Sequence, residues 1–289
     1  MPSGADMCVQ STHKIISSLT QASLLLVKKS VDILRLKRIL NLLITTSPSY
    51  ILMASLDLAR MQMATRGKEL LDITIMLANE VRNKINAIAG FTCFGKEISG
   101  SSGVYDIDAT KIHIKVMDLG LTGYQVAKLL NEGYKIQVEY ADLEAILLII
   151  TIGNTNRDIQ RLIKALENIS KEYMLAKPKI IKSLDFPIDL PEVVMSPREA
   201  LFAKTRKVNL QEAVGEVSAE IFSPYPPGIP LLNPGEKISK ELIKYLSEIH
   251  NRGGRIQGQA DSELKTIKVV TEKPRILGNF KIPLQAEVS

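Results

Sequence analysis

A lysine that follows two hydroxyl side chains and an imidazole is the feature of this sequence best suited to chemistry. Ser11, Thr12, His13 and Lys14 are consecutive and come directly after a short apolar run, Met7 to Val9. Such a run predicts a buried parallel strand. Because ligands bind at the carboxyl edge of open α/β sheets, a ligand could reach Lys14 there. A lysine amine can attack a carbonyl carbon to form a Schiff base, although a lysine after a strand is also typical of a solvated surface.

A second group of hydroxyl side chains, Thr45, Thr46 and Ser47, lies before a predicted helix. The proline that follows disfavours helix at Ser47, and Ser49 can cap the helix that begins after it. The free backbone N–H groups of a helix start also attract anions. This turn is therefore either a simple cap or a phosphate contact.

Two carboxylates, Glu220 and Glu236, could meet a cationic substrate or could be ordinary surface acids. The second ends a proline-rich stretch, Pro224 to Glu236. Because clustered prolines fix φ and exclude helix, this stretch predicts a rigid turn between strands.

Composition limits the classes of function. The chain has 289 residues, 45% of them hydrophobic, and 37 basic residues are interspersed with 31 acidic ones. With no tryptophan and no basic tail, no nucleic-acid partner is expected. Cys8 and Cys93 form neither a disulfide framework nor a metal motif, and the histidines lie far apart, so no metal site and a reducing cytoplasmic compartment are expected. The apolar runs are shorter than the ~20 residues that span a bilayer, so no membrane association is expected.

Hydrophobic periodicity predicts the elements that must position these side chains. The residues 90–103, rich in glycine and serine, are expected to form a connector and hinge. Thr122 is expected to cap a helix, and the methionines of residues 50–89 are expected to fill gaps in a core. The expected helices cover 31–44, 50–64, 68–89, 122–131 and 156–172, and the expected strands cover 111–116, 135–140 and 145–151.

Three separated motifs resemble one enzyme family. GAD, VQSTHK and LTQAS near Lys14, TTSPSYILMASLDLAR from Thr45 to Arg60, and SPREALFAK with PYPPGIPLLNPGE in the last third occur in the order of the Orn/Lys/Arg decarboxylases. The resemblance extends from Gly4 to about Val270.

The resemblance implies a cofactor and a reaction. By it, Lys14 is the Schiff-base lysine for pyridoxal 5′-phosphate, and Ser11 and His13 contact the cofactor. Thr45, Thr46 and Ser47 would reach the cofactor phosphate of the neighbouring subunit of a homodimer or higher oligomer. The implied reaction is decarboxylation of a basic amino acid, arginine preferred, or lysine or ornithine, to agmatine or a diamine.

The resemblance also implies a domain layout of the α/β class. The expected parts are an incomplete large domain of the aspartate-aminotransferase-like fold (1–103), a small α/β domain (104–176), a linker (177–195) and an α+β C-terminal decarboxylase domain (196–289). In the family, part of the cofactor site precedes the lysine strand. Two alternatives therefore stay open: a non-catalytic remnant or dimerising partner, and one half of a split enzyme that a missing N-terminal fragment completes in trans.

Overall fold

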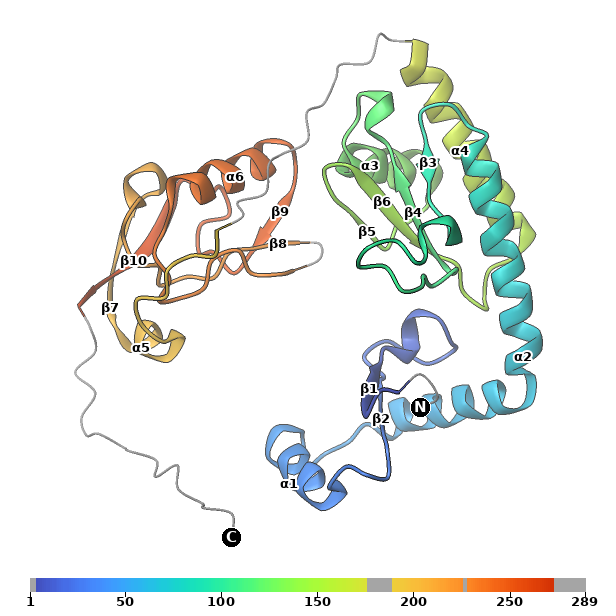
Figure 1. Cartoon of the computed structure of the whole chain (residues 1–289), viewed down its shortest axis with the longest axis horizontal. Coiled ribbons are helices and arrows are strands. Elements are labelled where there is room, and N and C mark those ends of the chain that lie inside the picture. Colours follow the sequence, from blue (N-terminus) through green and yellow to red (C-terminus); the bar gives the residue numbers. More distant parts are fainter. Residues whose placement is uncertain (1–3, 176–188, 226–227, 273–289) are drawn as a thin grey trace. The chain divides into compact units, whose positions relative to one another are not determined.

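The computed structural model describes residues 4–175, 189–225 and 228–272, and the chain forms two compact units. The first unit is Met1–Ile181 and the second is Lys182–Ser289 (Figure 1). Both mix helices and strands, in agreement with the expected α/β class. Most of the expected linker, 177–188, lies outside the described residues. Within the described ranges, no helix combines the length and the apolar content of a membrane span.

The first unit begins with a two-stranded antiparallel hairpin. Strand β1, Met7–Gln10, pairs with β2, Leu24–Val27, so that Met7 lies opposite Val27. The prediction of a buried parallel strand at Met7 to Val9 is therefore wrong: Met7 and Val9 are exposed. The reason is that a second apolar run, Leu24–Val27, follows a loop that contains a 3-10 turn and folds back on itself through the bond from Thr12 Oγ1 to the Ala22 carbonyl, so that the second run pairs antiparallel with the first.

Two helices follow the hairpin. Helix α1 covers Ile33–Leu43 and α2 covers Tyr50–Asn86. Ser49 Oγ caps α2 by accepting a hydrogen bond from Leu52 N at 3.4 Å, as predicted. The predicted break before Lys68 is wrong, because α2 is one helix of 37 residues.

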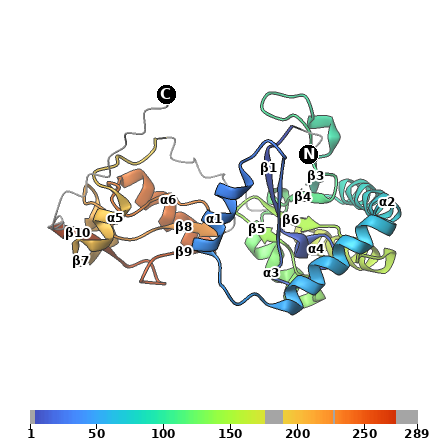
Figure 2. The same cartoon turned by 90° about the horizontal axis from the view of Figure 1, so that it is seen from below.

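Helix α2 nevertheless changes direction along its length (Figures 1 and 2). Thr65 Oγ1 donates to the carbonyl of Met61 at 2.9 Å, and Gly67 follows. Hydroxyl groups that bond back to the preceding turn, and glycines, are recognised causes of helix bending. The two predicted helices thus correspond to two directions of one helix.

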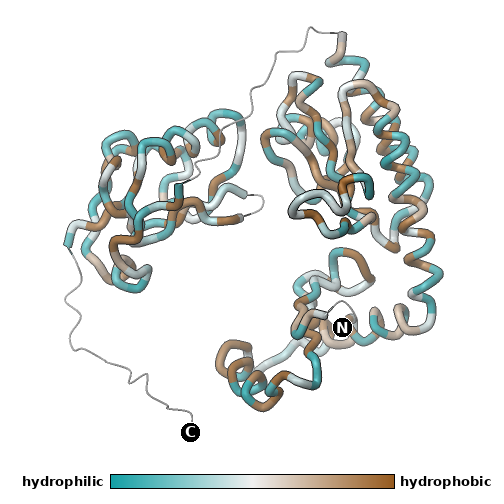
Figure 3. The backbone as a smooth tube through the Cα atoms, viewed as in Figure 1, coloured by the Kyte–Doolittle hydropathy of each residue, from teal (hydrophilic) through white to brown (hydrophobic). Residues whose placement is uncertain are grey.

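The prediction that the methionines of α2 fill gaps in a core is wrong. Met53, Met61 and Met76 are all at least half exposed. Of residues 50–66, only Ala59 is buried, whereas the second half of the helix contributes most of its buried residues. Helix α1 has no buried residue at all. Figure 3 shows hydrophobic residues along α1 and the β1–β2 hairpin, where they lie outside any core of this unit.

A four-stranded sheet forms the centre of the first unit. Its order is β3-β4-β6-β5, and every pairing is antiparallel. Its strands are β3 (Thr92–Cys93), β4 (Lys111–Lys115), β5 (Tyr140–Ala141) and β6 (Ala145–Ile149), with 3-10 turns η2 (Lys96–Ile98) and η3 (Met117–Leu119) between them.

Two expectations about this sheet were wrong. The residues 90–103, expected to be a connector, supply β3 and place Phe91 and Cys93 in the core. The strand expected over 135–140 is reduced to its last residue, because α3 continues to Tyr134 and Lys135 ends it in the left-handed conformation with φ 56°.

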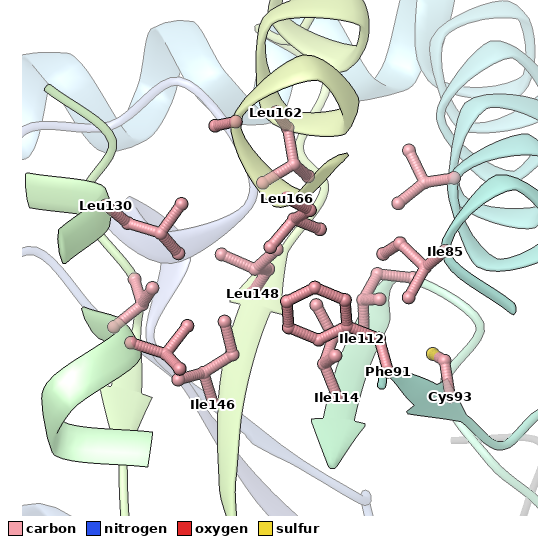
Figure 4. Packing of buried hydrophobic residues seen from close by; sticks show 14 of the residues in the cluster. Ile85, Phe91, Cys93, Ile112, Ile114, Leu130, Ile146, Leu148, Leu162 and Leu166 are labelled. Carbon is pink, nitrogen blue, oxygen red and sulfur yellow. The ribbon is translucent and has the colours of Figure 1, made fainter. Parts of the chain in front are cut away.

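Helices α3 (Gly123–Tyr134), α4 (Asn156–Leu175) and the second half of α2 contribute to one core with the sheet (Figure 4). Ile112 and Ile114 of β4 and Ile146 of β6 have no exposed surface. Thr122 caps α3 in a capping box with Gln125, which confirms the predicted cap. Gly123 is required there because a Cβ atom would lie 2.0 Å from the carbonyl oxygen of Ala145.

The described residues of the second unit form short strands and two α-helices. Phe222 and Leu232 lie at its centre, and Ser196 caps α5 in a capping box. Strand β7 pairs with β10 and β8 pairs with β9, both antiparallel. Its elements are α5 (Pro197–Phe202), β7 (Lys204–Asn209), η4 (Leu210–Ala213), β8 (Ser223–Tyr225), α6 (Lys240–Asn251), β9 (Arg255–Gln257) and β10 (Thr266–Glu272).

Candidate functional site

Lys14 ends a 3-10 turn, η1 (Thr12–Lys14), in the loop between β1 and β2. Three backbone bonds close the turn: Lys14 N donates to the carbonyl of Ser11 and Ile16 N to that of Thr12, each at 3.1 Å, and Ile15 N also donates to the Thr12 carbonyl. Ser11 precedes the turn without capping it and is exposed. The three polar residues before Lys14 therefore share one turn with it, as their sequence positions require.

Two side chains at the start of this loop contact the same backbone carbonyl near its end. Thr12 Oγ1 donates to the carbonyl of Ala22 at 3.1 Å, and His13 Nδ1 lies 2.9 Å from the same oxygen. Thr12 and Ala22 are both buried. A carbonyl oxygen can only accept, so Nδ1 carries the proton in this contact and Nε2 is the nitrogen available to a ligand. The loop thus holds His13 in one tautomer beside Lys14.

The Lys14 side chain reaches an acid of the four-stranded sheet. Its Nζ lies 2.5 Å from Oε1 of Glu139, with 48% of the lysine side chain and 30% of the glutamate side chain exposed. Glu139 directly precedes β5, and its backbone N donates to the carbonyl of Leu147 in β6 at 2.8 Å. Sequence reasoning missed Glu139. The two residues are 125 positions apart, and no spacing or motif in the sequence connects them.

The hydroxyl turn lies elsewhere on the first unit, between α1 and α2 (Figure 1). Thr45 Oγ1 accepts a hydrogen bond from Ser47 N at 3.1 Å, which closes the turn on itself. Thr45, Thr46 and Ser47 are all exposed. The capping interpretation is confirmed for Ser49, and a phosphate contact by the three hydroxyl residues stays a prediction.

The two candidate substrate carboxylates are in the second unit, where backbone groups engage both. Glu220 is 8% exposed, and its carboxylate accepts from Ala260 N at 3.2 Å and from Lys268 N at 3.3 Å. Glu236 accepts from the backbone N and the side-chain amide of Asn233, at 2.6 and 3.1 Å. These contacts account for both acids as structural residues, and a substrate role for them stays a prediction without support from this geometry.

The remaining nucleophilic and metal-binding side chains are dispersed. Across residues 4–175, 189–225 and 228–272, no group of three or more His, Cys, Asp or Glu side chains could hold a metal ion. Cys8 and Cys93 are both free thiols. Cys93 is buried, and this burial raises the pKa of its thiol to about 11, so the thiol is a poor nucleophile. Lys14 therefore stays the candidate nucleophile predicted from the sequence.

Family models match most of the chain. The model of the Orn/Lys/Arg decarboxylase major domain matches residues 4–158, and that of the Orn/Lys/Arg decarboxylase C-terminal domain matches residues 182–269. The arginine decarboxylases of Halalkalibacterium halodurans and Bacillus subtilis are each 42% identical to the chain, over 280 and 277 residues. Each alignment covers 96% of this chain and 56% of the relative.

Solved structures of similar proteins agree with the fold. The lysine decarboxylase of Francisella novicida is 25% identical and superposes with a TM-score of 0.72, covering 92% of this chain and 49% of that one. The constitutive lysine decarboxylase of Escherichia coli, 22% identical, has a similar fold with a TM-score of 0.71. The chain spans about half the length of the curated relatives and of the solved structures that it matches.

Proposed function

The chain belongs to the Orn/Lys/Arg decarboxylase family, and we propose that Lys14 is the residue that holds pyridoxal 5′-phosphate covalently in the decarboxylation of a basic amino acid. The observation that carries this proposal is the position of Lys14 on a closed turn, with a partly exposed side chain directly after an oriented imidazole. When bound, the cofactor supplies the electron sink that accepts the electrons left by departing carbon dioxide.

The residues around Lys14 fit the needs of such a cofactor. A primary amine is required for the covalent attachment, and Lys14 provides one on a side chain that is about half exposed. A phosphate group requires hydrogen-bond donors, and the Ser11 hydroxyl can provide one from the same turn. The Nδ1–H of His13 is already donated to the Ala22 carbonyl, so the imidazole would contact the cofactor through its ring rather than as a hydrogen-bond donor. Thr45, Thr46 and Ser47 lie on an exposed turn that is separate from the turn of Lys14. Their hydroxyl groups would donate to the phosphate held by a neighbouring subunit.

Arginine is the substrate that the comparisons favour. The relatives with 41–42% identity are named arginine decarboxylases, whereas those named lysine decarboxylases are 24–25% identical. The proposed reaction converts arginine to agmatine and carbon dioxide. Lysine and ornithine are the other basic substrates to be tested in the same assay.

Exposed apolar side chains support a partner for the first unit. Leu42 and Leu43 of α1 are 85% and 78% exposed, and Ile51 of α2 is 72% exposed. Contiguous exposed apolar surface marks interaction sites. A second copy of the chain, or another protein chain, would cover it. This observation also favours a second candidate function, that of a non-catalytic partner that associates through these helices.

The two free thiols fit a reducing, cytoplasmic location.

A trapping experiment tests the role of Lys14. The purified chain is incubated with pyridoxal 5′-phosphate and reduced with borohydride, and the modified lysine is identified by mass spectrometry. We expect modification at Lys14, with a matching absorbance band that Lys14→Ala abolishes. Lys28→Ala is the matched control, because Lys28 lies in the same hairpin and binds Gly4 and Asp6 instead.

Two results would contradict the proposal. One is a band that persists in Lys14→Ala, and the other is modification spread evenly over surface lysines. If no band forms but light scattering gives a mass above the 32.0 kDa of one chain, the non-catalytic association function is favoured instead.

A further inference from the structure

We propose that Glu139 is a positioning residue for Lys14: it holds the lysine as a paired ammonium at the end of the hairpin until a carbonyl compound displaces it. The reactive role of Lys14 rests on the proposed function. The pairing itself rests on the 2.5 Å contact between Nζ and Oε1.

Both backbones that carry this contact are fixed. Lys14 is anchored by its own N–H bond to Ser11 and by the fastening of the loop to Ala22. Glu139 is anchored by its N–H bond to Leu147 in β6. The contact therefore joins two defined points on the hairpin and the sheet, and it determines where Nζ lies before any ligand arrives.

The pairing also places a carboxylate against the lysine ammonium. An opposite charge within about 4 Å favours the charged form of an amine. An ammonium has no lone pair, so it cannot attack carbon. Before it can attack, Lys14 must leave the carboxylate and lose one proton to solvent. The freed lone pair then bonds the carbonyl carbon, and the carbonyl oxygen leaves as water with the two remaining amine protons.

The partial exposure of the pair limits the size of the effect. Exposed ion pairs are worth a fraction of a kcal/mol to about 1 kcal/mol. The reactivity of Lys14 should therefore change by about two- to five-fold when the carboxylate is removed. A change of this size is measurable when another lysine of the same molecule is the internal reference.

Competitive labelling of the full chain with trace acetic anhydride, without cofactor, tests the proposal. Acetylation of Lys14 is measured relative to Lys28 at pH 8 by mass spectrometry. In Glu139→Gln we expect this ratio to rise about two- to five-fold. Glu139→Asp, which keeps the charge, should restore much of the wild-type ratio. Glu132→Gln removes the same charge from an exposed position of α3 and should leave the ratio unchanged.

Two outcomes overturn the pairing. One is an unchanged ratio in Glu139→Gln. The other is an equal rise of Lys14 and Lys28 labelling against the remaining lysines, which would show that Glu139 only fastens the hairpin. Because the labelling needs no cofactor, its result is separate from the trapping experiment. A raised ratio with no trapping at Lys14 would refute the cofactor role and keep the pairing.

Discussion

Two regions of the first unit differ in how far their apolar side chains are buried. Around the four-stranded sheet, Ile112, Ile114 and Ile146 are completely buried by helices of the same unit (Figure 4). In the hairpin, α1 and the first half of α2, apolar residues such as Leu42 remain exposed. Since burial contributes roughly 25 cal/mol per Å² of apolar surface, the sheet region has its own source of stability and the hairpin region has little.

The candidate catalytic lysine therefore lies in the hairpin region, which buries little apolar surface of its own. Lys14 is on the hairpin, which contacts the rest of the unit through polar bonds such as Lys14 to Glu139 and Leu19 N to Ser55 Oγ at 3.2 Å. A partner that covers the exposed residues would therefore act directly on the region that carries Lys14. The following predictions test this contrast.

The largest expected difference is between the two thiols. Cys93 is 2% exposed and burial raises its pKa to about 11, whereas Cys8 is half-buried on β1. At pH 8 a thiol with that pKa is only about 0.1% thiolate. We expect iodoacetamide to modify Cys8 at least about 100-fold faster than Cys93 in the native chain. Mass spectrometry of each peptide measures both rates, and urea should abolish the difference. Comparable native rates would show that the sheet region opens as readily as the hairpin.

A matched pair of isoleucines gives the next largest effect. Ile114→Ala should lower the free energy of unfolding of the sheet region by about 3–4 kcal/mol, because it leaves a cavity in a closed core. Ile51→Ala, at a position 72% exposed, should change it by less than about 0.5 kcal/mol. Because the chain has two units, the exposure of Cys93 in urea is the appropriate measurement for this region. A large cost of Ile51→Ala would mean that a partner already covers α2 in solution.

The smallest expected effect is a pH dependence of the sheet region. Burial lowers the pKa of His113 below its ordinary value of 6.5, so the unfolded chain binds a proton that the folded chain does not. Stability should be greatest above about pH 6.5 and should decrease as the pH falls from there towards the lowered pKa. Asp158, whose pKa is lowered by the Thr155 N–H and hydroxyl, titrates below this window.

Urea midpoints of Cys93 exposure between pH 5 and 8 measure this dependence. His113→Gln should flatten it, and His250→Gln in the second unit is the control for loss of a histidine elsewhere. An equal slope in wild type and His113→Gln would exclude His113 as its source.

The sequence predicted best those features that depend on neighbouring residues. The predicted caps Ser49 and Thr122 each come three residues before the N–H group that donates to them, and a side chain can be judged at that distance. Helix α4 was likewise predicted to within a few residues, because its apolar positions repeat at helical spacing.

The features that depend on distant residues were missed. The run at Met7 to Val9 fits a strand, but its partner determines whether that strand is parallel and buried. The methionines of α2 predicted a core along the whole helix, but only tertiary packing determines which half of the helix is buried. Glu139 and Lys14 are brought into contact only by the tertiary structure. Lys14 itself could be proposed from its local motif, whereas its partner could not.

The shared acceptor at Ala22 gives the imidazole beside Lys14 two independent ends. The Nδ1 proton is donated to the Ala22 carbonyl, so that end of the ring holds the loop together. Nε2 then carries a lone pair and can only accept, so the outward end of the ring offers an acceptor to any group that docks beside Lys14.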